Sequence, residues 1–457
     1  MTGGDDRVED QIEQWRSYLV HRDAIAPADV DELEGHLRDQ IDGLEASGLS
    51  GEEAFLVAVR RMGRIDELSR EFAREHSDRL WKQLVADDDE AGAARRNGLA
   101  LAIGLGVAAA LVVKIPALFG LTIQGDPQFY ARNLALLILP FLAAYFLVRH
   151  RSGIATIVSV AVPFAATALV LNLYPFAPDG ATLPLAVIHS LVLLWVATGI
   201  AYIDGKWRSD RARMDFIRFT GEWFVYLVLI ALGGGVLAAL TMGVFSTIGV
   251  DASWFVGEWL VPCGLAGAVV IAGWLVEAKQ SVIENIAPVL TKLFTPLFTA
   301  LLLALIVAAI FQAAVFGAQE IEVDQRDLLI IFDLVLIVVL GLLLYSLSAR
   351  DPSRPPGWFD RLQLLLVAAA LVVDVIVLIA MVSRIGEYGA SPNKLASLGL
   401  NLILLVNLSG AAWLQFRFVR GKAAFGRVER WQTAYIPVYL AWAAIVVVAF
   451  PPVFGFA

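Results

Sequence analysis

The chain has 457 residues, of which 58% are hydrophobic and 17% are charged, and its mean hydropathy is +0.70. These values exclude a wholly soluble protein, because such a chain would leave too much apolar surface in water, and they indicate a polytopic membrane protein. The formal net charge of −9 is unevenly placed: residues 1–90 carry 24 acids and 11 bases, so the rest of the chain is mildly basic. An acidic head argues against direct nucleic-acid binding, since phosphate contacts need Lys and Arg.

Residues 1–85 predict a small cytosolic bundle of four amphipathic helices. Apolar residues recur at spacings of three and four in each: Val8, Ile12, Trp15 and Leu19; Val30, Leu33, Leu37, Ile41 and Leu44; Ala54, Val57, Ala58 and Met62; Ile65, Leu68 and Phe72. Ser50 and Glu53 have the spacing of a capping box before the third helix. The first residues are acidic and do not resemble a signal peptide, so we expect the head to stay in the cytosol.

The segment GLSGEEAFLVAVRRMGRIDELSREF, residues 48–72, follows the helical run DVDELEGHLRDQIDGL. It resembles the permease-prefix domain, also called the HTH-associated α-helical signalling domain. The matching positions are Gly48, Ser50, Glu52, Glu53, Ala54, Ala58, Gly63, Glu67 and Leu68. Ser69 departs from the usual Ala of that family, and Ile65 stands where Pro is common.

This resemblance implies protein–protein signalling in a bacterium, with a PadR-type winged-helix regulator as the partner. We take Leu37, Phe55 and Phe72 as the candidate partner-binding face. A bundle of about 70 residues buries little core for its size and would gain stability from a partner. The alternative is that the head serves only folding or stability.

Residues 86–97, ADDDEAGAARRN, form an acidic-to-basic linker whose basic pair is typical of a membrane anchor. A transmembrane domain over 98–451 and a short outer tail over 452–457 follow. A bilayer crossing takes about 20 apolar residues. The eleven expected spans are 98–121, 133–148, 153–173, 183–203, 223–248, 255–276, 294–316, 328–347, 362–382, 395–418 and 432–451.

The loops predict how the chain is threaded. With the head inside, the cytosolic segments carry 19 Lys and Arg residues and the outer segments carry four. The positive-inside rule therefore places the N-terminus in the cytosol and the C-terminus outside. Together with the resemblance, this predicts an all-α, multi-pass protein of the bacterial plasma membrane.

Polar side chains within the spans are costly and mark functional candidates. The candidate intramembrane site comprises Asp374 near the middle of the ninth span, Asp333 in the eighth and Lys114 in the first. In a transport interpretation, the two aspartates bind a proton or a cation. Alternatively, they form interhelical ion pairs or hydrogen bonds that hold the bundle together. Lys114 would snorkel or pair with an aspartate.

The segment RIGEYGASPNK, residues 384–394, joins the ninth and tenth spans and provides the candidate outer-edge loop, with Glu387, Tyr388 and Asn393. It resembles an E-Y-G-x-T/S-P-N-R/K run in an uncharacterised bacterial polytopic family, a domain of unknown function. That resemblance implies no chemistry. A plain interfacial turn before a helix that starts at Pro392 is the alternative.

The single cysteine, Cys263, leaves no disulfide framework or Cys-rich metal site within one chain. We also find no metal-ligand histidine pair, Walker motif or Gly-x-Ser-x-Gly elbow. We therefore predict no catalytic residues, no cofactor and no metal, and favour a membrane sensor or regulator over an enzyme. A secondary transporter or permease that uses the intramembrane aspartates is the alternative, and a membrane-embedded enzyme comes third.

Overall fold

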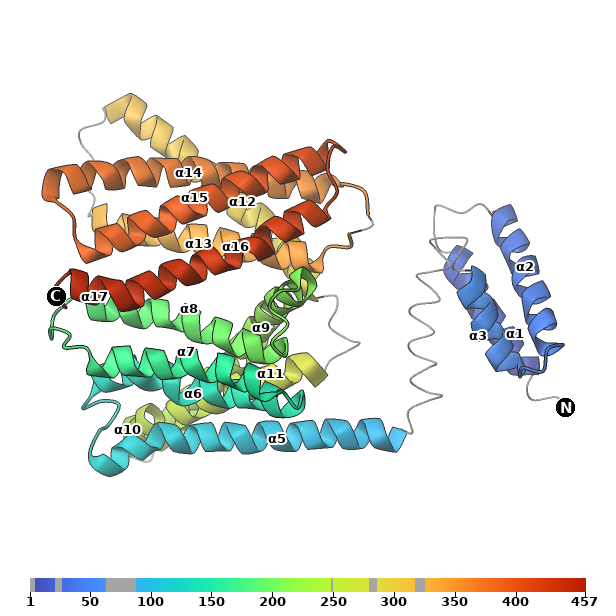
Figure 1. Ribbon diagram of the computed structural model, residues 1–457, viewed down its shortest axis with the longest axis horizontal. Coiled ribbons are helices and arrows are strands. Elements are labelled where there is room, and N and C mark those ends of the chain that lie inside the picture. Colours follow the sequence, from blue (N-terminus) through green and yellow to red (C-terminus); the bar gives the residue numbers. More distant parts are fainter. Residues whose placement is uncertain are drawn as a thin grey trace. The chain divides into compact units, whose positions relative to one another are not determined.

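The computed structural model describes residues 5–20, 27–62, 88–247, 250–278, 286–316, 325–352 and 354–457. All regular elements in these ranges are helices (Figure 1). The chain divides into two compact units, residues 1–97 and 98–457, which we call the head and the body.

The head contains α1 (Asp5–Val20), α2 (Pro27–Glu45) and α3 (Gly51–Met62). Their apolar stripes close on one another around Trp15, Leu37 and Phe55, which are 0–2% exposed. On the outside, Arg38 of α2 donates to Glu9 of α1 at 2.9 Å. The fourth predicted helix, with Ile65, Leu68 and Phe72, lies outside the described residues.

The start of α3 follows the predicted cap in part. The Glu53 carboxylate accepts a hydrogen bond from the Ser50 backbone N–H at 3.0 Å, which is one of the two bonds of a capping box.

The body consists mainly of long helices that lie side by side, and it also contains two short ones, α10 and α17. In chain order they are α5 (Asp88–Lys114), α6 (Pro127–Arg149), α7 (Ile154–Leu173), α8 (Thr182–Tyr202), α9 (Asp210–Thr247), α10 (Ser253–Phe255), α11 (Val261–Ala278), α12 (Ile286–Phe316), α13 (Gln325–Ala349), α14 (Trp358–Tyr388), α15 (Pro392–Val419), α16 (Gly426–Ala444) and α17 (Phe450–Val453). A 3₁₀-helix, η1 (Ile115–Phe119), follows α5, and two π-helical turns, η2 (Val256–Leu260) and η3 (Ile445–Ala449), adjoin α10 and α16.

Eleven helical segments in the described ranges are long and apolar enough to cross a membrane. They match the eleven expected spans in order, so the prediction of an all-α polytopic membrane protein is confirmed. The acidic-to-basic linker is helical from Asp88 onward, because α5 begins there and runs into the first span. The expected tail over 452–457 begins inside α17, and its last carbonyls accept hydrogen bonds from Ala177 and Thr182 at 2.9 and 3.1 Å.

The body has two hydrophobic cores. The first is built from α5, α6, α8, α9 and α11 around residues such as Leu142, Phe146 and Phe219. The second is built from α12 to α16 around Leu343, Leu366 and Leu404. We call these the first and second bundles. They meet where α16 packs on α8 and α13 packs on α9.

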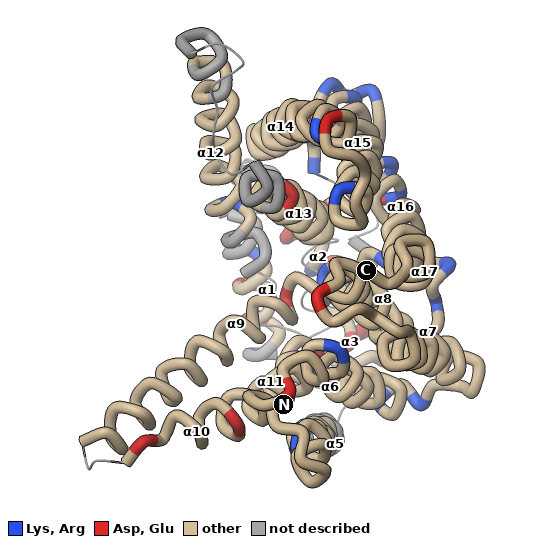
Figure 2. The backbone as a smooth tube through the Cα atoms, turned by 90° about the vertical axis from the view of Figure 1, so that its left-hand side faces the viewer, with Lys and Arg blue, Asp and Glu red and all other residues tan. Residues whose placement is uncertain are grey.

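Helix α9 is longer than a bilayer requires. Its 38 residues span about 57 Å, against a hydrocarbon core of about 30 Å. Its second half projects from the rest of the body together with α10 (Figure 2). The side chains there are mostly exposed and apolar, as with Leu232, Val236 and Leu240. Such a surface fits contact with lipid.

The body has two ends, which we name by the chain. The proximal end is where α5 enters at Gly98, and the distal end is where Ala457 lies (Figure 1). Helices α6, α8 and α11 finish at the proximal end, as expected for alternating spans.

The second bundle depends on close approach of helices at glycine. A Cβ atom added to Gly399 of α15 would lie 2.0 Å from the Trp442 ring of α16, whereas one added to Gly341 of α13 meets nothing within 4 Å. We expect Gly399→Ala to destabilise the protein by about 1–3 kcal/mol through overpacking. Gly341→Ala should be neutral or stabilising by up to about 1 kcal/mol through helix propensity. Thermal unfolding of the full-length protein in detergent compares the two, and equal melting temperatures would contradict this packing.

Candidate functional site

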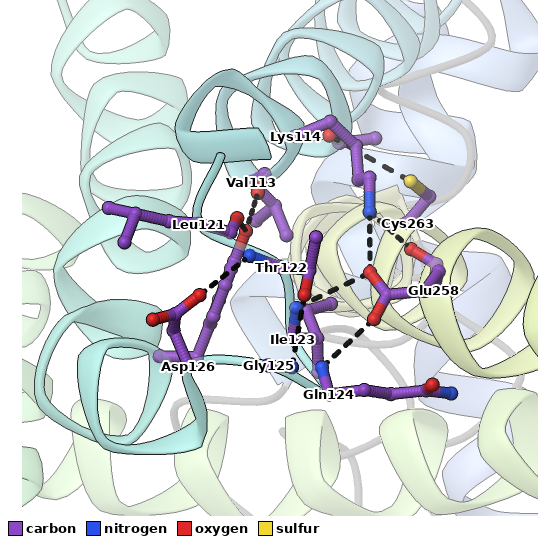
Figure 3. Close-up of polar contacts among 12 residues, drawn as sticks. Val113, Lys114, Leu121, Thr122, Ile123, Gln124, Gly125, Asp126, Glu258 and Cys263 are labelled. Carbon is purple, nitrogen blue, oxygen red and sulfur yellow. Dashed lines mark hydrogen bonds and ion pairs between the residues drawn. The ribbon is translucent and has the colours of Figure 1, made fainter. Parts of the chain in front are cut away.

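Lys114 forms a buried ion pair with Glu258 in the first bundle. Its Nζ donates to the Glu258 backbone oxygen at 2.6 Å and to the carboxylate Oε2 at 3.2 Å (Figure 3). Lys114 is 8% exposed and Glu258 4%. The ammonium also lies 4.8 Å from the centre of the Trp259 ring. The prediction that Lys114 shares a site with Asp374 and Asp333 is therefore wrong, since its partner is a glutamate in the other bundle.

Glu258 also holds the loop that follows η1. Its Oε1 accepts from the Gln124 N–H at 2.9 Å and its Oε2 from the Ile123 N–H at 3.3 Å (Figure 3). A buried carboxylate with one cationic and two backbone donors has its charge and its hydrogen bonds satisfied within the protein. This network therefore has a structural role at the distal end: it joins α5, η2 and the loop after η1. It leaves no unpaired charge of Lys114 or Glu258 for a substrate.

Asp333 of α13 is held by a neighbouring helix. The Asn401 Nδ2 of α15 donates to Asp333 Oδ1 at 2.8 Å. This contact matches the interhelical hydrogen bond that was the alternative to ion binding. A similar pair, Asn133 and Asn172, joins α6 to α7 with bonds of 2.8 and 3.1 Å.

Asp374 differs from the other charged residues that the sequence singled out in the spans. It is 0% exposed at the middle of α14, and neither carboxylate oxygen has a hydrogen-bond partner among the described residues. Its electrostatic neighbours are Asp333 on α13 and Tyr439 on α16. The Tyr439 hydroxyl is also buried, with no hydrogen-bond partner in the described ranges. The structure thus brings together the two predicted aspartates and adds a tyrosine that sequence reasoning missed.

Amide side chains continue this polar interior along the second bundle. The Gln432 Nε2 donates to Asn407 Oδ1 at 3.1 Å between α16 and α15. Gln415, one to two turns from the end of α15, is 4% exposed with both amide atoms unpartnered among the described residues. Buried polar atoms without partners are rare in folded proteins and call for an explanation.

The candidate outer-edge loop is an exposed helix connection. Helix α14 ends at Tyr388, and the Ser391 Oγ caps α15 by accepting from the Lys394 N–H at 3.4 Å. The Lys394 Nζ donates to the Gly389 oxygen at 2.8 Å. Glu387 and Tyr388 are exposed and Asn393 is partly buried. This arrangement matches a plain interfacial turn rather than a formed site.

The predicted partner-binding face of the head is wrong for two of its three residues. Leu37 is 0% exposed and Phe55 2% exposed, because both fill the core between α1, α2 and α3. Phe72 lies outside the described residues. The surface that the head does expose on α2 is acidic, with Asp39, Asp42 and Glu45.

An open polar pocket of about 780 Å³ lies at the proximal end of the first bundle. It sits between the ends of α6, α8 and α11 and the start of α9, over Tyr202 and Phe219, whose rings stack at 4.3 Å. Its charged lining residues are Arg149, His150, Asp204, Lys206, Asp215, Arg218, Glu222 and Glu277. From the sequence, the Lys and Arg residues of this set were interpreted only as positive charges that set the membrane topology. The pocket that they line was not predicted.

Glu277 organises one wall of this pocket. Its carboxylate accepts from the Tyr145 hydroxyl at 2.7 Å and lies 3.5 Å from His150 Nε2 and 3.8 Å from Arg149 Nε. The hydrogen bond to Glu277 raises the pKa of His150 above its usual value. The sequence contained a signal for this cluster. Arg149-His150 and Glu277 lie at the ends of two spans that finish at the same end of the bundle, so charged residues of opposite sign could be expected to meet there.

The described residues contain no group of three or more His, Cys, Asp or Glu side chains that could hold a metal ion. Comparisons with family models, with curated proteins and with solved structures find no match for this chain. The resemblances at residues 48–72 and 384–394 therefore stay predictions, and the arguments for function rest on the geometry above.

Breaking the buried pair should be costly. We expect Lys114→Met or Glu258→Gln alone to destabilise the protein by about 3–5 kcal/mol, because each leaves a buried charge without its partner. The double variant should cost less than the sum of the two. Lys206→Met is the control, since Lys206 is largely exposed in a 3.9 Å pair with Asp204 and should change stability by about 1 kcal/mol or less. Thermal unfolding measures the stability of all four variants. A Lys114→Met variant as stable as Lys206→Met would contradict the structural role of the ion pair.

The pairing of His150 with Glu277 makes a pH-dependent prediction. Because the folded-state pKa of His150 is raised, the pair stabilises the protein fully below the unfolded pKa of about 6.5 and loses this effect as pH rises through the folded value. Glu277→Gln should lower the pKa of His150, as measured by NMR of labelled histidine. The difference in stability between wild type and variant should then narrow with rising pH. An unchanged His150 titration would show that Glu277 is not its partner.

Proposed function

We propose that this protein is a membrane sensor or regulator whose N-terminal head binds a cytosolic protein partner. The observation that supports it is the organisation of the chain: a separate compact unit with its own closed core precedes an eleven-span body. The excess of bases in alternate loops supports a cytosolic N-terminus and an outer C-terminus in a bacterial plasma membrane.

The chemistry of the head supports a basic protein partner. Asp39, Asp42 and Glu45 recur along the exposed side of α2, while the buried apolar residues of the helix pack into the core of the head. A complementary positive surface on the partner would be steered to this side of the head. A PadR-type winged-helix regulator, as the resemblance implies, is our candidate, because a protein that binds DNA carries such a surface.

Regulation also requires a body with two arrangements that bias what the head exposes. The body consists of two bundles with separate cores that meet through α8, α9, α13 and α16. Packed cores resist gradual deformation, so a change between two discrete arrangements would take place at this junction.

A secondary transporter is the second candidate, and Asp374 is the observation that favours it. A carboxyl group buried in a transmembrane bundle without a partner is typical of an ion or proton pathway. If the body transports, Asp374→Asn should abolish substrate accumulation while the protein is still made and folded. Unchanged uptake would remove this candidate.

The test of the regulatory function is capture of the partner by the full-length protein. Tagged protein is purified from native membranes after crosslinking, as wild type, as Asp39→Lys/Asp42→Lys/Glu45→Lys and as Asp10→Lys/Glu13→Lys. The last is a control on α1, where both residues are also exposed. We expect mass spectrometry to find a DNA-binding regulator with wild type and the control, and at least a tenfold loss with the α2 variant. A folded wild-type protein that captures no regulator would contradict the proposal and favour transport.

A further inference from the structure

We propose that Asp374 is a proton-binding site of the body, occupied by a proton at neutral pH, with Asp333 and Tyr439 as its electrostatic neighbours. This goes beyond the proposed function because it names a ligand of the body. It does not depend on the head or on its partner, and it holds for a sensor and a transporter alike.

The first argument is the absence of compensation around the carboxyl group. Asp374 is fully buried, and neither of its oxygens accepts a hydrogen bond from the described residues. An ionised carboxylate in such a place costs several kcal/mol or more, so a buried acid without a partner takes up a proton instead. The contrast with Glu258 is direct, since that buried carboxylate has one lysine and two backbone N–H donors.

The second argument concerns the charges on every helix packed against α14 or against its polar interior. Asp333 on α13 adds a like charge, and Tyr439 on α16 adds an un-ionised hydroxyl. The bases on these helices and on α14 itself lie near the helix ends: Lys292, Arg326, Arg361, Arg384, Lys394, Arg417, Arg427 and Arg430. On α14 itself the nearest base, Arg384, lies ten residues beyond Asp374, which is about 15 Å along the helix axis.

The third argument is that a proton satisfies what the structure leaves open. A protonated carboxyl group has one O–H donor as well as acceptor oxygens. The Tyr439 hydroxyl and the Asn401 Oδ1 are both buried without a partner among the described residues. Asn401 is joined to the same cluster through its bond to Asp333. A single proton on Asp374 therefore removes the unpaired charge and leaves a neutral carboxyl group in this polar interior.

A divalent cation fits this cluster less well. The two aspartates are not joined by a third acid, histidine or cysteine in the described part of the chain. Calcium takes six to eight oxygen ligands and magnesium an octahedral set, which two carboxyl groups and an amide do not complete.

The experiment is infrared difference spectroscopy of the full-length protein in lipid, which reports the C=O stretch of a protonated carboxyl group. The samples are wild type, Asp374→Asn and Asp333→Asn, recorded from acid to alkaline pH. Asp374→Asn is close in shape to the protonated acid, and Asp333→Asn removes the neighbouring carboxyl group that already has a donor.

We expect wild type at neutral pH to show a carboxylic-acid band that is lost completely in Asp374→Asn, retained in Asp333→Asn and abolished in wild type at alkaline pH. The wild-type melting temperature should fall as the band disappears, while that of Asp374→Asn should not follow it. Identical spectra of wild type and Asp374→Asn at neutral pH would overturn the proposal. So would a band that sodium ions remove at constant pH and ionic strength, because that result would assign the site to a metal cation. The wild-type titration tests the proposal even if a variant fails to fold.

Discussion

The structure depends on one constraint: a hydrocarbon interior supplies no hydrogen bonds and no counter-ions. Backbone N–H and C=O groups must then be satisfied within each segment, so the body is built of helices in all its described spans. Side-chain charges within the spans must find a partner or lose their charge. Lys114 and Glu258 show the first solution, with a buried pair that also holds a loop. Asp374 has no hydrogen-bond partner among the described residues, and we propose that it takes the second.

The same constraint explains how polarity is distributed between the two bundles. In the first bundle, several polar groups are paired between helices, as in Asn133 with Asn172 and Tyr145 with Glu277. In the second bundle, Asp374, Gln415 and Tyr439 have buried polar atoms with no hydrogen-bond partner in the described part of the chain. Buried polar groups whose hydrogen bonds are only partly made lower the stability of the folded protein. Our proposal accordingly assigns the proton site of the body to the second bundle.

The charged pocket is mechanically connected to the second bundle. The pocket opens at the proximal end, where Glu277 brings together Arg149, His150 and Tyr145. Helix α9 begins in the wall of this pocket and packs on α13, so one rigid helix joins the pocket to the second bundle. Arg218 of α9 donates to the Ser348 oxygen next to the end of α13 at 3.0 Å and strengthens this junction. A shift of one bundle against the other would therefore alter the pocket directly.

The sequence by itself determined the fold class, the number and order of the spans and the apolar stripes of the head, because these follow from local periodicity and length. It also identified Asp374 as the notable intramembrane acid, since polarity within an apolar run is visible in one dimension. It failed at Leu37 and Phe55, because a stripe shows that a face is buried but not whether its partner is another protein or the next helix.

Only the tertiary structure decided which side chains meet. The partner of Lys114 lies 144 residues away, and Glu277 reaches across 132 residues to Tyr145. Residues so far apart are brought together by helix packing, which no local pattern encodes. That no described residue donates a hydrogen bond to Asp374 is likewise a property of the helices packed around it, and this is why its role could be argued only in three dimensions.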